Sequence, residues 1–177
     1  MKNIFSFDAE CNGLWGQPFA IAAVVMSPEG NELDRFLARC PIDGEPTLWV
    51  KENAIPVMKD IADTHTTYTA MLKDFAAFYH SHRETSETVV FVGSIVESGI
   101  LWDMRRAELI GDYEAPFPVH DLSGRLEQVG EDPIGLEAYA DKFGIQKDDL
   151  PGGYHNPLWD ASLTARVYLH LVSRVSK

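Results

Sequence analysis

The sequence has few cysteines and no long apolar segment. Only two of its 177 residues are cysteines, Cys11 and Cys40, and no Cys/His spacing indicates a zinc site. Two unpaired thiols fit a reducing compartment. No apolar run reaches the ~20 residues of a membrane helix, and the apolar stretch after Lys2 is too short for a secretory signal. We therefore expect a cytoplasmic protein that is not held in a membrane.

Positive charge is also scarce, which limits the partners that fit. The chain has 15 lysines and arginines against 27 aspartates and glutamates, and its formal net charge is −12. The cations are scattered, whereas a protein that wraps duplex nucleic acid usually carries a basic stripe. Bound divalent cations can offset several acids locally. The charge therefore favours a short or single-stranded nucleic acid, held near an active site, over a long duplex.

Hydrophobic residues make up 45% of the chain, enough for a folded core, and we expect one domain over residues 1–177. Apolar runs and turn signals predict an antiparallel meander of three strands, at 3–9, 18–27 and 32–40. Residues 47–62 are expected to be helical in pieces. Further strands are predicted at 88–93 and 117–122, and helices at 67–82, 96–110, 134–144 and from Pro157 onward, capped by Asn156. This order predicts an α/β fold, a mixed five-stranded sheet flanked by helices.

The first candidate site is Asp8-Ala9-Glu10, at the end of the first predicted strand. Residues i and i+2 of a strand point to the same face, so the two carboxylates aim together. Two adjacent carboxylates repel unless a cation lies between them, and Mg²⁺ and Mn²⁺ prefer such oxygen ligands. A pair of exposed acids at a strand end is the alternative interpretation of this motif on its own.

Two more candidate acids lie later in the chain. Asp160 is near the start of the last helix, on the face of Leu163 and Val167, where an acid is costly unless paired or bound to metal. His155 precedes that helix and could reach a metal-held water. Glu97 follows the strand 88–93 and opens a helix. Each acid could instead simply favour a helix N-terminus through the helix dipole.

Together these motifs resemble the DEDDh family of 3′–5′ exonucleases. Asp8, Glu10, Gly13 and Leu14 match the first motif of that family, and His155 and Asp160 match its third. The resemblance implies an RNase H-like fold and two ions, Mg²⁺ or Mn²⁺, held by the four carboxylates of Asp8, Glu10, Glu97 and Asp160. It also implies His155 as general base and phosphodiester hydrolysis at the 3′ end of single-stranded or short RNA or DNA. Because small members of this family are often dimers, the resemblance also implies a homodimer as a candidate assembly.

The second motif departs from the family pattern, because Glu97 stands where the family has aspartate. Glutamate keeps the charge and adds a methylene of reach; Asp103, six residues on, is a competing candidate. Two alternatives are a catalytically impaired nuclease fold that binds a partner, and a metal-dependent nucleotidase or other phosphoesterase. Gly13, Leu14 and Trp15 are candidate substrate-binding residues, with Trp15 able to stack on a base. Trp102 and Trp159 are expected in the core or just behind the site.

Overall fold

The computed structural model describes residues 1–93 and 95–175 of the chain. Its centre is a five-stranded mixed sheet in the order β3-β2-β1-β4-β5. Strands β1 (Asn3–Cys11), β2 (Pro18–Met26) and β3 (Glu32–Arg39) form the predicted antiparallel meander. Strands β4 (Ser86–Val90) and β5 (Val119–Asp121) continue the sheet in parallel with β1. The predicted sheet is therefore confirmed.

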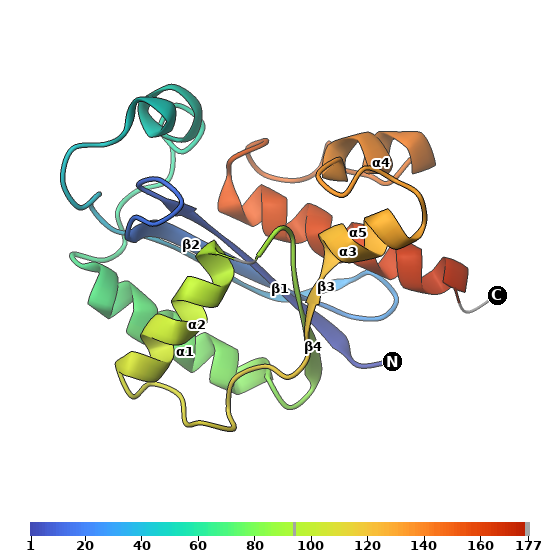
Figure 1. Cartoon of the computed structure of the whole chain (residues 1–177), viewed down its shortest axis with the longest axis horizontal. Coiled ribbons are helices and arrows are strands. Elements are labelled where there is room, and N and C mark those ends of the chain that lie inside the picture. Colours follow the sequence, from blue (N-terminus) through green and yellow to red (C-terminus); the bar gives the residue numbers. More distant parts are fainter. Residues whose placement is uncertain (94, 176–177) are drawn as a thin grey trace.

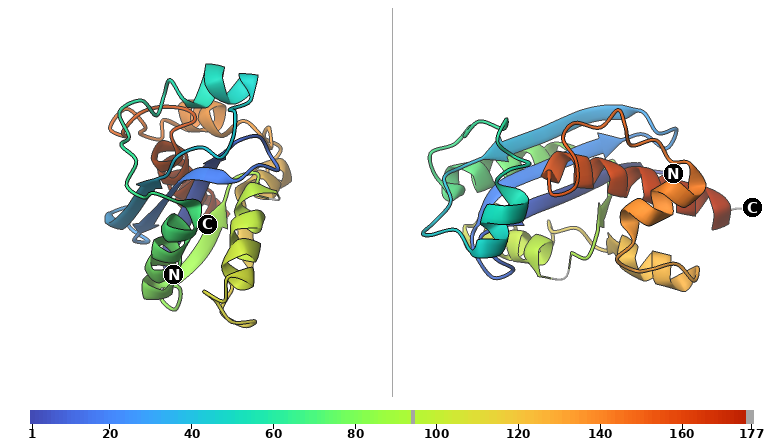
Figure 2. Two further views of the ribbon diagram at one scale, coloured as in Figure 1. Left: turned by 90° about the vertical axis from the view of Figure 1, so that its left-hand side faces the viewer. Right: turned by 90° about the horizontal axis from the view of Figure 1, so that it is seen from above.

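Helices cover both faces of the sheet, as Figures 1 and 2 show. Helices α1 (Tyr68–His82) and α2 (Val96–Arg106) pack on one face. Helices α3 (Leu122–Gln128), α4 (Leu136–Phe143) and α5 (Pro157–Val175) pack on the other. A short π-helix, η1 (Val50–Ala54), lies in the segment expected to be helical in pieces. Among the helices of the described residues, none combines the length and apolar character needed to cross a membrane.

Side-chain alternation along β1 divides the core into two parts. Phe5 and Phe7 point to the face of α1, where Phe7 lies 5.4 Å from the ring of Phe75. Ile4 points to the other face and packs with residues of α5 such as Leu163. Because successive side chains of a strand alternate, Asp8 and Glu10 share the face of Ile4, which is the face of α5.

The structure departs from the predicted elements most clearly at β4, α3 and α2. Strand β4 ends at Val90, not at Gly93, because the amides of Val92 and Gly93 donate to the carboxylate of Asp121 at 3.2 Å each. Asp121 also accepts a hydrogen bond from the Ser123 amide and so begins α3, a helix that the sequence analysis did not predict. Helix α2 ends at Arg106, before the predicted residue 110, and residues 107–110 form turns.

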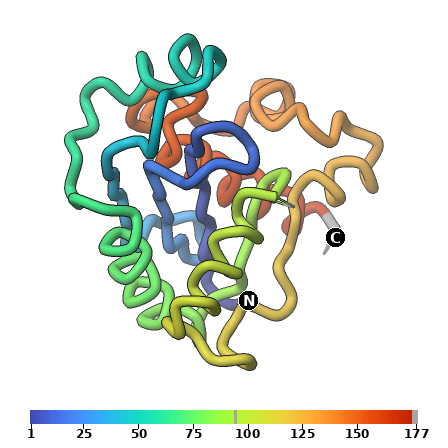
Figure 3. The backbone as a smooth tube through the Cα atoms, turned by 60° about the vertical axis from the view of Figure 1, so that its left-hand side comes forward, coloured from blue at the N-terminus to red at the C-terminus, as the bar shows by residue number. Residues whose placement is uncertain are grey.

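The connections at one end of the sheet gather around the end of β1, which Figure 3 shows as a tube. The turn between β1 and β2 is fixed to the following segment by the side chain of Asn12. Its amide group donates to the carbonyl oxygens of Asp43 and Glu45, both at 3.1 Å, and its oxygen accepts from the Thr47 amide at 2.9 Å. Residues 43–47 are thereby held beside the end of β1, where the candidate acids lie.

Candidate active site

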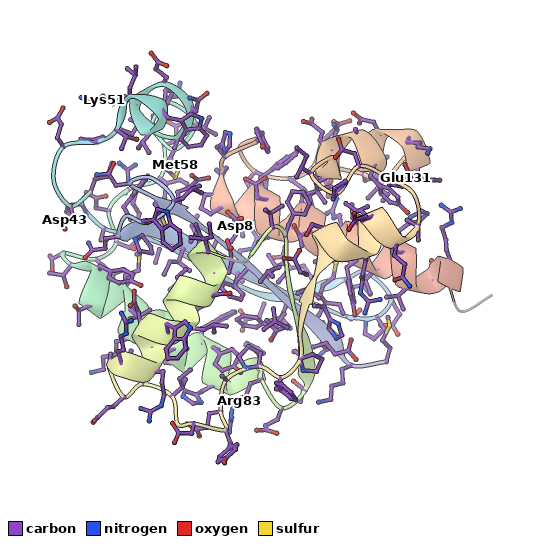
Figure 4. The ribbon with its side chains drawn as sticks, in the orientation of Figure 1. Asp8, Asp43, Lys51, Met58, Arg83 and Glu131 are labelled. Carbon is purple, nitrogen blue, oxygen red and sulfur yellow. The ribbon has the colours of Figure 1, made fainter. Side chains whose placement is uncertain are left out.

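Asp8 and Glu10 lie where β1 extends beyond its neighbour β4. The pairing of β1 with β4 ends at Ser6 and Val89, while β1 continues to Cys11. Figure 4 shows Asp8 between the first turns of α2 and α5. Glu10 is buried, with 7% of its surface exposed, whereas Asp8 is half-buried. The strand therefore delivers both carboxylates to a point that two helices also reach.

Helix α5 brings Asp160 to this point through its first turn. The Asn156 side chain caps the helix, accepting from the amides of Leu158 at 3.1 Å and Trp159 at 3.4 Å, which confirms the predicted cap. Asp160 is buried and accepts a hydrogen bond from the His155 amide at 3.0 Å. Ligand atoms of Asp8, Glu10 and Asp160 all lie within 4.8 Å of one another. A single cation could therefore contact all three side chains.

Glu97 approaches the same carboxylates from the opposite face of the sheet. It is in the first turn of α2, is buried to 4% exposure, and accepts a hydrogen bond from the Ala9 amide in β1. That amide lies where β4 would continue if it were longer. Asp103, the competing candidate, instead accepts a hydrogen bond from the Tyr68 hydroxyl at 2.9 Å. Glu97 is therefore the acid of α2 that reaches the end of β1.

His155 is held beside Glu10 by its backbone and by two aromatic rings. Its φ is +68°, an uncommon conformation for a residue with a side chain. Its Nδ1 lies 3.8 Å from Oε1 of Glu10. The Trp49 ring meets the imidazole edge-to-face at 4.9 Å between centroids, and the Tyr154 ring lies at 3.9 Å. The imidazole is therefore positioned at the acidic cluster, although it comes from a loop.

Burial raises the pKa of each of these acids, and repulsion by neighbouring acids adds to the rise for Asp8, Glu97 and Asp160. For Asp8 the main cause is burial, followed by the charges of Asp160, Glu97 and Glu10. Burial also raises the pKa of Glu97 to about 8, and that of Asp160 to about 8. Burial raises the pKa of Glu10, and the neighbouring His155 imidazole opposes that rise. Such a set of oxygen donors fits a hard divalent cation, which would remove the repulsion.

The predicted substrate-binding residues lie next to the acids, in the turn between β1 and β2. Gly13 and Leu14 line a cavity of about 460 Å³ together with Glu10, Thr47 and Trp49. Gly13 has a φ of +86°, which favours glycine. Leu14 is exposed, and so is Trp15, at 87%.

Three features of this region were not found from the sequence. Trp49 and Thr47 lie in an irregular segment with no periodic pattern, and only tertiary packing brings them to the site. Asp121 ends β5, and its charge raises the pKa of Glu97.

The prediction for Trp159 is confirmed, since it is 5% exposed, but the prediction for Trp102 is wrong, since it is 63% exposed. Its position on the outer side of α2 could not be told from spacing alone.

Comparison with known proteins supports the fold through structure only. No family model matches the sequence, and no curated protein matches it significantly. Among solved structures, the nuclease domain of 3′hExo, a DEDDh family member bound to rAMP, is similar with a TM-score of 0.69 and 14% identity, over 97% of this chain and 91% of that one. Exonuclease X in complex with 5′ overhanging duplex DNA is similar with a TM-score of 0.66 and 14% identity, over 98% of this chain and 93% of that one.

Exonuclease I of E. coli in complex with a dT13 oligonucleotide is also similar, with a TM-score of 0.65 and 16% identity. The alignment covers 99% of this chain but only 42% of that larger protein. All three neighbours are exonuclease or nuclease domains that share the mixed sheet and its flanking helices with this chain. The chain therefore has the RNase H-like fold of the DEDDh exonuclease domains, as its motifs predict.

Proposed function

We propose that this protein is a metal-dependent 3′–5′ exonuclease that hydrolyses phosphodiester bonds at the 3′ end of single-stranded or short nucleic acids. The observation that carries the proposal is the meeting of Asp8, Glu10 and Asp160 within 4.8 Å, with His155 3.8 Å from Glu10. The similarity to exonuclease domains solved with nucleotide, DNA or oligonucleotide supports it.

Asp8, Glu10, Glu97 and Asp160 are the proposed ligands of two Mg²⁺ or Mn²⁺ ions. Their side chains bring acidic oxygens together in a largely buried place, where burial raises all four pKa values and neighbouring acids add to the rise for Asp8, Glu97 and Asp160. Buried like charges are unfavourable unless cations or protons neutralise them. Two bound divalent ions would supply an activated water and stabilise negative charge on the phosphate.

His155 is the proposed general base. Histidine readily exchanges protons near neutral pH, and this imidazole lies at the edge of the acidic cluster. Glu10 beside it would stabilise the imidazolium that forms when His155 accepts the proton of the attacking water. Trp49 and Tyr154 restrict the orientation of the ring. The terminal nucleotide would occupy the cavity lined by Glu10, Gly13 and Leu14, with Trp15 available for stacking.

Assays on end-labelled oligonucleotides test the proposal and its rivals together. Purified protein is incubated with 5′-labelled and 3′-labelled DNA and RNA decamers, and with mononucleotides, in Mg²⁺, Mn²⁺ or EDTA. We expect a ladder from the 5′-labelled decamer, immediate release of the labelled nucleotide from the 3′-labelled one, and no reaction in EDTA. Phosphate release from mononucleotides alone would identify a nucleotidase. Binding without hydrolysis under every condition would identify an inactive nuclease fold. Sedimentation of the same preparation tests the predicted homodimer.

A further inference from the structure

A groove extends from the acidic cluster along the outer side of α2. Its first part, described above, is lined by Glu10, Leu14 and Val96. The next part, of about 440 Å³, shares Leu14 and Val96 with the first and reaches Trp102 and Arg106. A third part shares Trp102 and Arg106 and extends towards the end of α2. Because neighbouring parts share lining residues, the three hollows adjoin one another, and the first adjoins the proposed active site.

Helix α2 divides its side chains between the sheet and this groove. Glu97, Ile100 and Met104 are buried. The groove receives residues at a spacing of four, seven and eight from Ser98, which lie on one side of a helix: Ser98, Trp102, Arg105 and Arg106. With 11 residues, α2 spans ~16 Å along its axis. Figure 1 shows the helix running from near the end of β1 towards the lower left of the view.

Three of the four tryptophans of the chain line this groove, Trp49 in its first part and the more exposed Trp15 and Trp102 in the next. Trp15 is 87% exposed and Trp102 is 63% exposed, and both line the same part of the groove together with the exposed Leu14. Single exposed apolar residues are common on protein surfaces, but a contiguous exposed patch usually marks a binding surface. Aromatic rings along a groove are the surfaces on which unpaired bases stack.

Two arginines lie on the same groove, although the chain as a whole is strongly acidic. The Arg106 side chain is 76% exposed and lies 3.8 Å from Asp103. Arg105 pairs with Asp112 at 2.6 Å and is 44% exposed. Exposed ion pairs of this kind contribute little to stability, so a phosphate group can compete with the carboxylates for the guanidinium groups. The groove therefore offers stacking surfaces and phosphate partners side by side.

We propose that this groove binds the nucleotides upstream of the one being removed, as an unpaired strand, with bases stacked on Trp15 and Trp102 and a phosphate at Arg106. The direction of the strand rests on the proposed function, which places its 3′ end at the acidic cluster. At ~3.4 Å per stacked nucleotide, ~16 Å holds about five nucleotides. Bases in a duplex are paired and stacked on each other, so a duplex would not use the indoles. The substrate is then a single strand of several nucleotides.

Substitution of Trp102 tests the stacking contact. Binding is measured by the fluorescence anisotropy of 5′-fluorescein-labelled dT10 and rU10 with Ca²⁺ present. Hydrolysis is measured with Mg²⁺ or Mn²⁺ as KM and kcat on an unlabelled decamer and an unlabelled dinucleotide, both DNA or both RNA according to which the enzyme prefers. We expect Trp102→Ala to raise Kd and KM for the decamer roughly 5- to 100-fold, with kcat and the dinucleotide KM unchanged. Trp102→Phe should restore most of the decamer affinity. Tyr113→Ala, which removes a fully exposed ring outside the groove, is the control.

Substitution of Arg106 tests the phosphate contact through its salt dependence. Neutralising one phosphate contributes about 0.7 to the slope of log Kd against log salt for a single strand, so we expect Arg106→Gln to flatten the slope by about that amount. Arg35→Gln is the matched control, because Arg35 also forms an exposed ion pair with an acid three residues away but lies on β3. It should leave the slope unchanged.

The outcomes separate this proposal from the proposed function. A wild-type protein that binds the decamers through Trp102 but hydrolyses nothing would contradict the proposed exonuclease activity and support the proposed binding groove. If the wild-type protein degrades the decamer and Trp102→Ala changes neither Kd nor KM, the binding groove is contradicted and the exonuclease activity is supported. Failure of the wild-type protein to bind either probe would overturn the groove as well.

Discussion

The two ends of the sheet both carry acidic side chains, but in opposite situations. Figure 4 labels one residue near each end of the sheet: Asp8 in the middle of the view and Arg83 at its lower edge. At the second end, Arg83 pairs with Glu84 at 3.1 Å and with Glu114 at 3.4 Å. Glu114 also accepts a hydrogen bond from the Gly111 amide, and these contacts lower the pKa of Glu114. Acids at this end therefore have their neutralising partners within the protein.

At the first end the acids are close together, with Glu10, Glu97 and Asp160 buried and Asp8 half-buried. Among the described residues, the only group with a basic nitrogen in ion-pair distance of Asp8, Glu10, Glu97 or Asp160 is the His155 imidazole, at 3.8 Å from Glu10. Burial and repulsion raise the pKa values here, whereas partners lower that of Glu114 at the other end. The acids of the proposed metal site therefore differ from those at the other end by their burial without a cationic partner, and not by acidity as such.

The largest expected effect is the loss of activity when a proposed ligand loses its charge. Asp8→Asn and Asp160→Asn should each reduce the initial rate on a 5′-labelled decamer at least about 10³-fold, since losing a metal ligand removes several kcal/mol of transition-state stabilisation. Glu114→Gln, at the paired end of the sheet, should keep the wild-type rate. Circular dichroism should show that all three variants are folded. A fully active Asp8→Asn enzyme would remove the basis for treating the two ends differently.

The next effect concerns His155, the one basic group at the unpaired end. His155→Ala should lower kcat about 10²- to 10⁴-fold, the usual contribution of general acid–base catalysis. Its affinity for Mn²⁺, measured by titration calorimetry, should stay near the wild-type value, because the side chain is assigned a proton-transfer role. His82→Ala serves as control, since His82 also lies near an acid, 2.9 Å from Asp34, but away from the site. Loss of Mn²⁺ binding in His155→Ala would make His155 a ligand.

A smaller effect, and a sharper test, distinguishes two acids of the same helix. Glu97 is buried at the end of β1, whereas Asp103 has partners in Tyr68 and Arg106. Glu97→Gln should lower kcat at least about 10²-fold, and Glu97→Asp should retain part of the activity because it keeps the charge but loses reach. Asp103→Asn should keep a wild-type kcat. The reverse result would move the second motif to Asp103 without removing the acidic cluster on the other face.

Local sequence patterns predict most of this site because its acids lie on regular elements. Two-residue alternation in β1 places Asp8 and Glu10 on one face, and the Asn156 cap fixes where α5 begins and hence where Asp160 points. These relations depend on residues close in sequence, so propensity and period are enough to find them. The roles of these residues remain predictions until the variants are measured.

The remainder depends on contacts between distant segments. Asp121 shortens β4 and begins α3, and no pattern in the sequence around residue 90 indicates either effect. Trp49 reaches His155 only because the Asn12 side chain holds the preceding residues against the turn between β1 and β2. The sequence analysis places Trp102 in the core or just behind the site, but the side chain is exposed. Its exposure depends on where the sheet lies relative to α2, and no local sequence pattern predicts that arrangement.

The smallest expected effect is a change of stability with pH and metal. The folded pKa values of Glu97 and Asp160, both about 8, lie above the ordinary values of 4.5 and 3.8. Between these limits the folded protein binds more protons than the unfolded chain, so the free energy of unfolding falls as pH rises, and the loss is complete above pH 8. Without metal, the melting temperature should therefore be at least about 3 °C lower at pH 8.5 than at pH 5.5.

Millimolar Mg²⁺ or Mn²⁺ should reverse this trend. A divalent cation takes the place of the protons, and because it binds the deprotonated acids of the folded state it should raise the melting temperature most at pH 8.5. Asp160→Asn lacks one of the two groups, so in EDTA its melting temperature should depend less on pH than that of the wild type. Glu114→Gln should follow the wild-type curve in both conditions. Melting curves that ignore metal at pH 8.5 would show that the acids at this end need no cation, and the contrast between the two ends would then have no bearing on function.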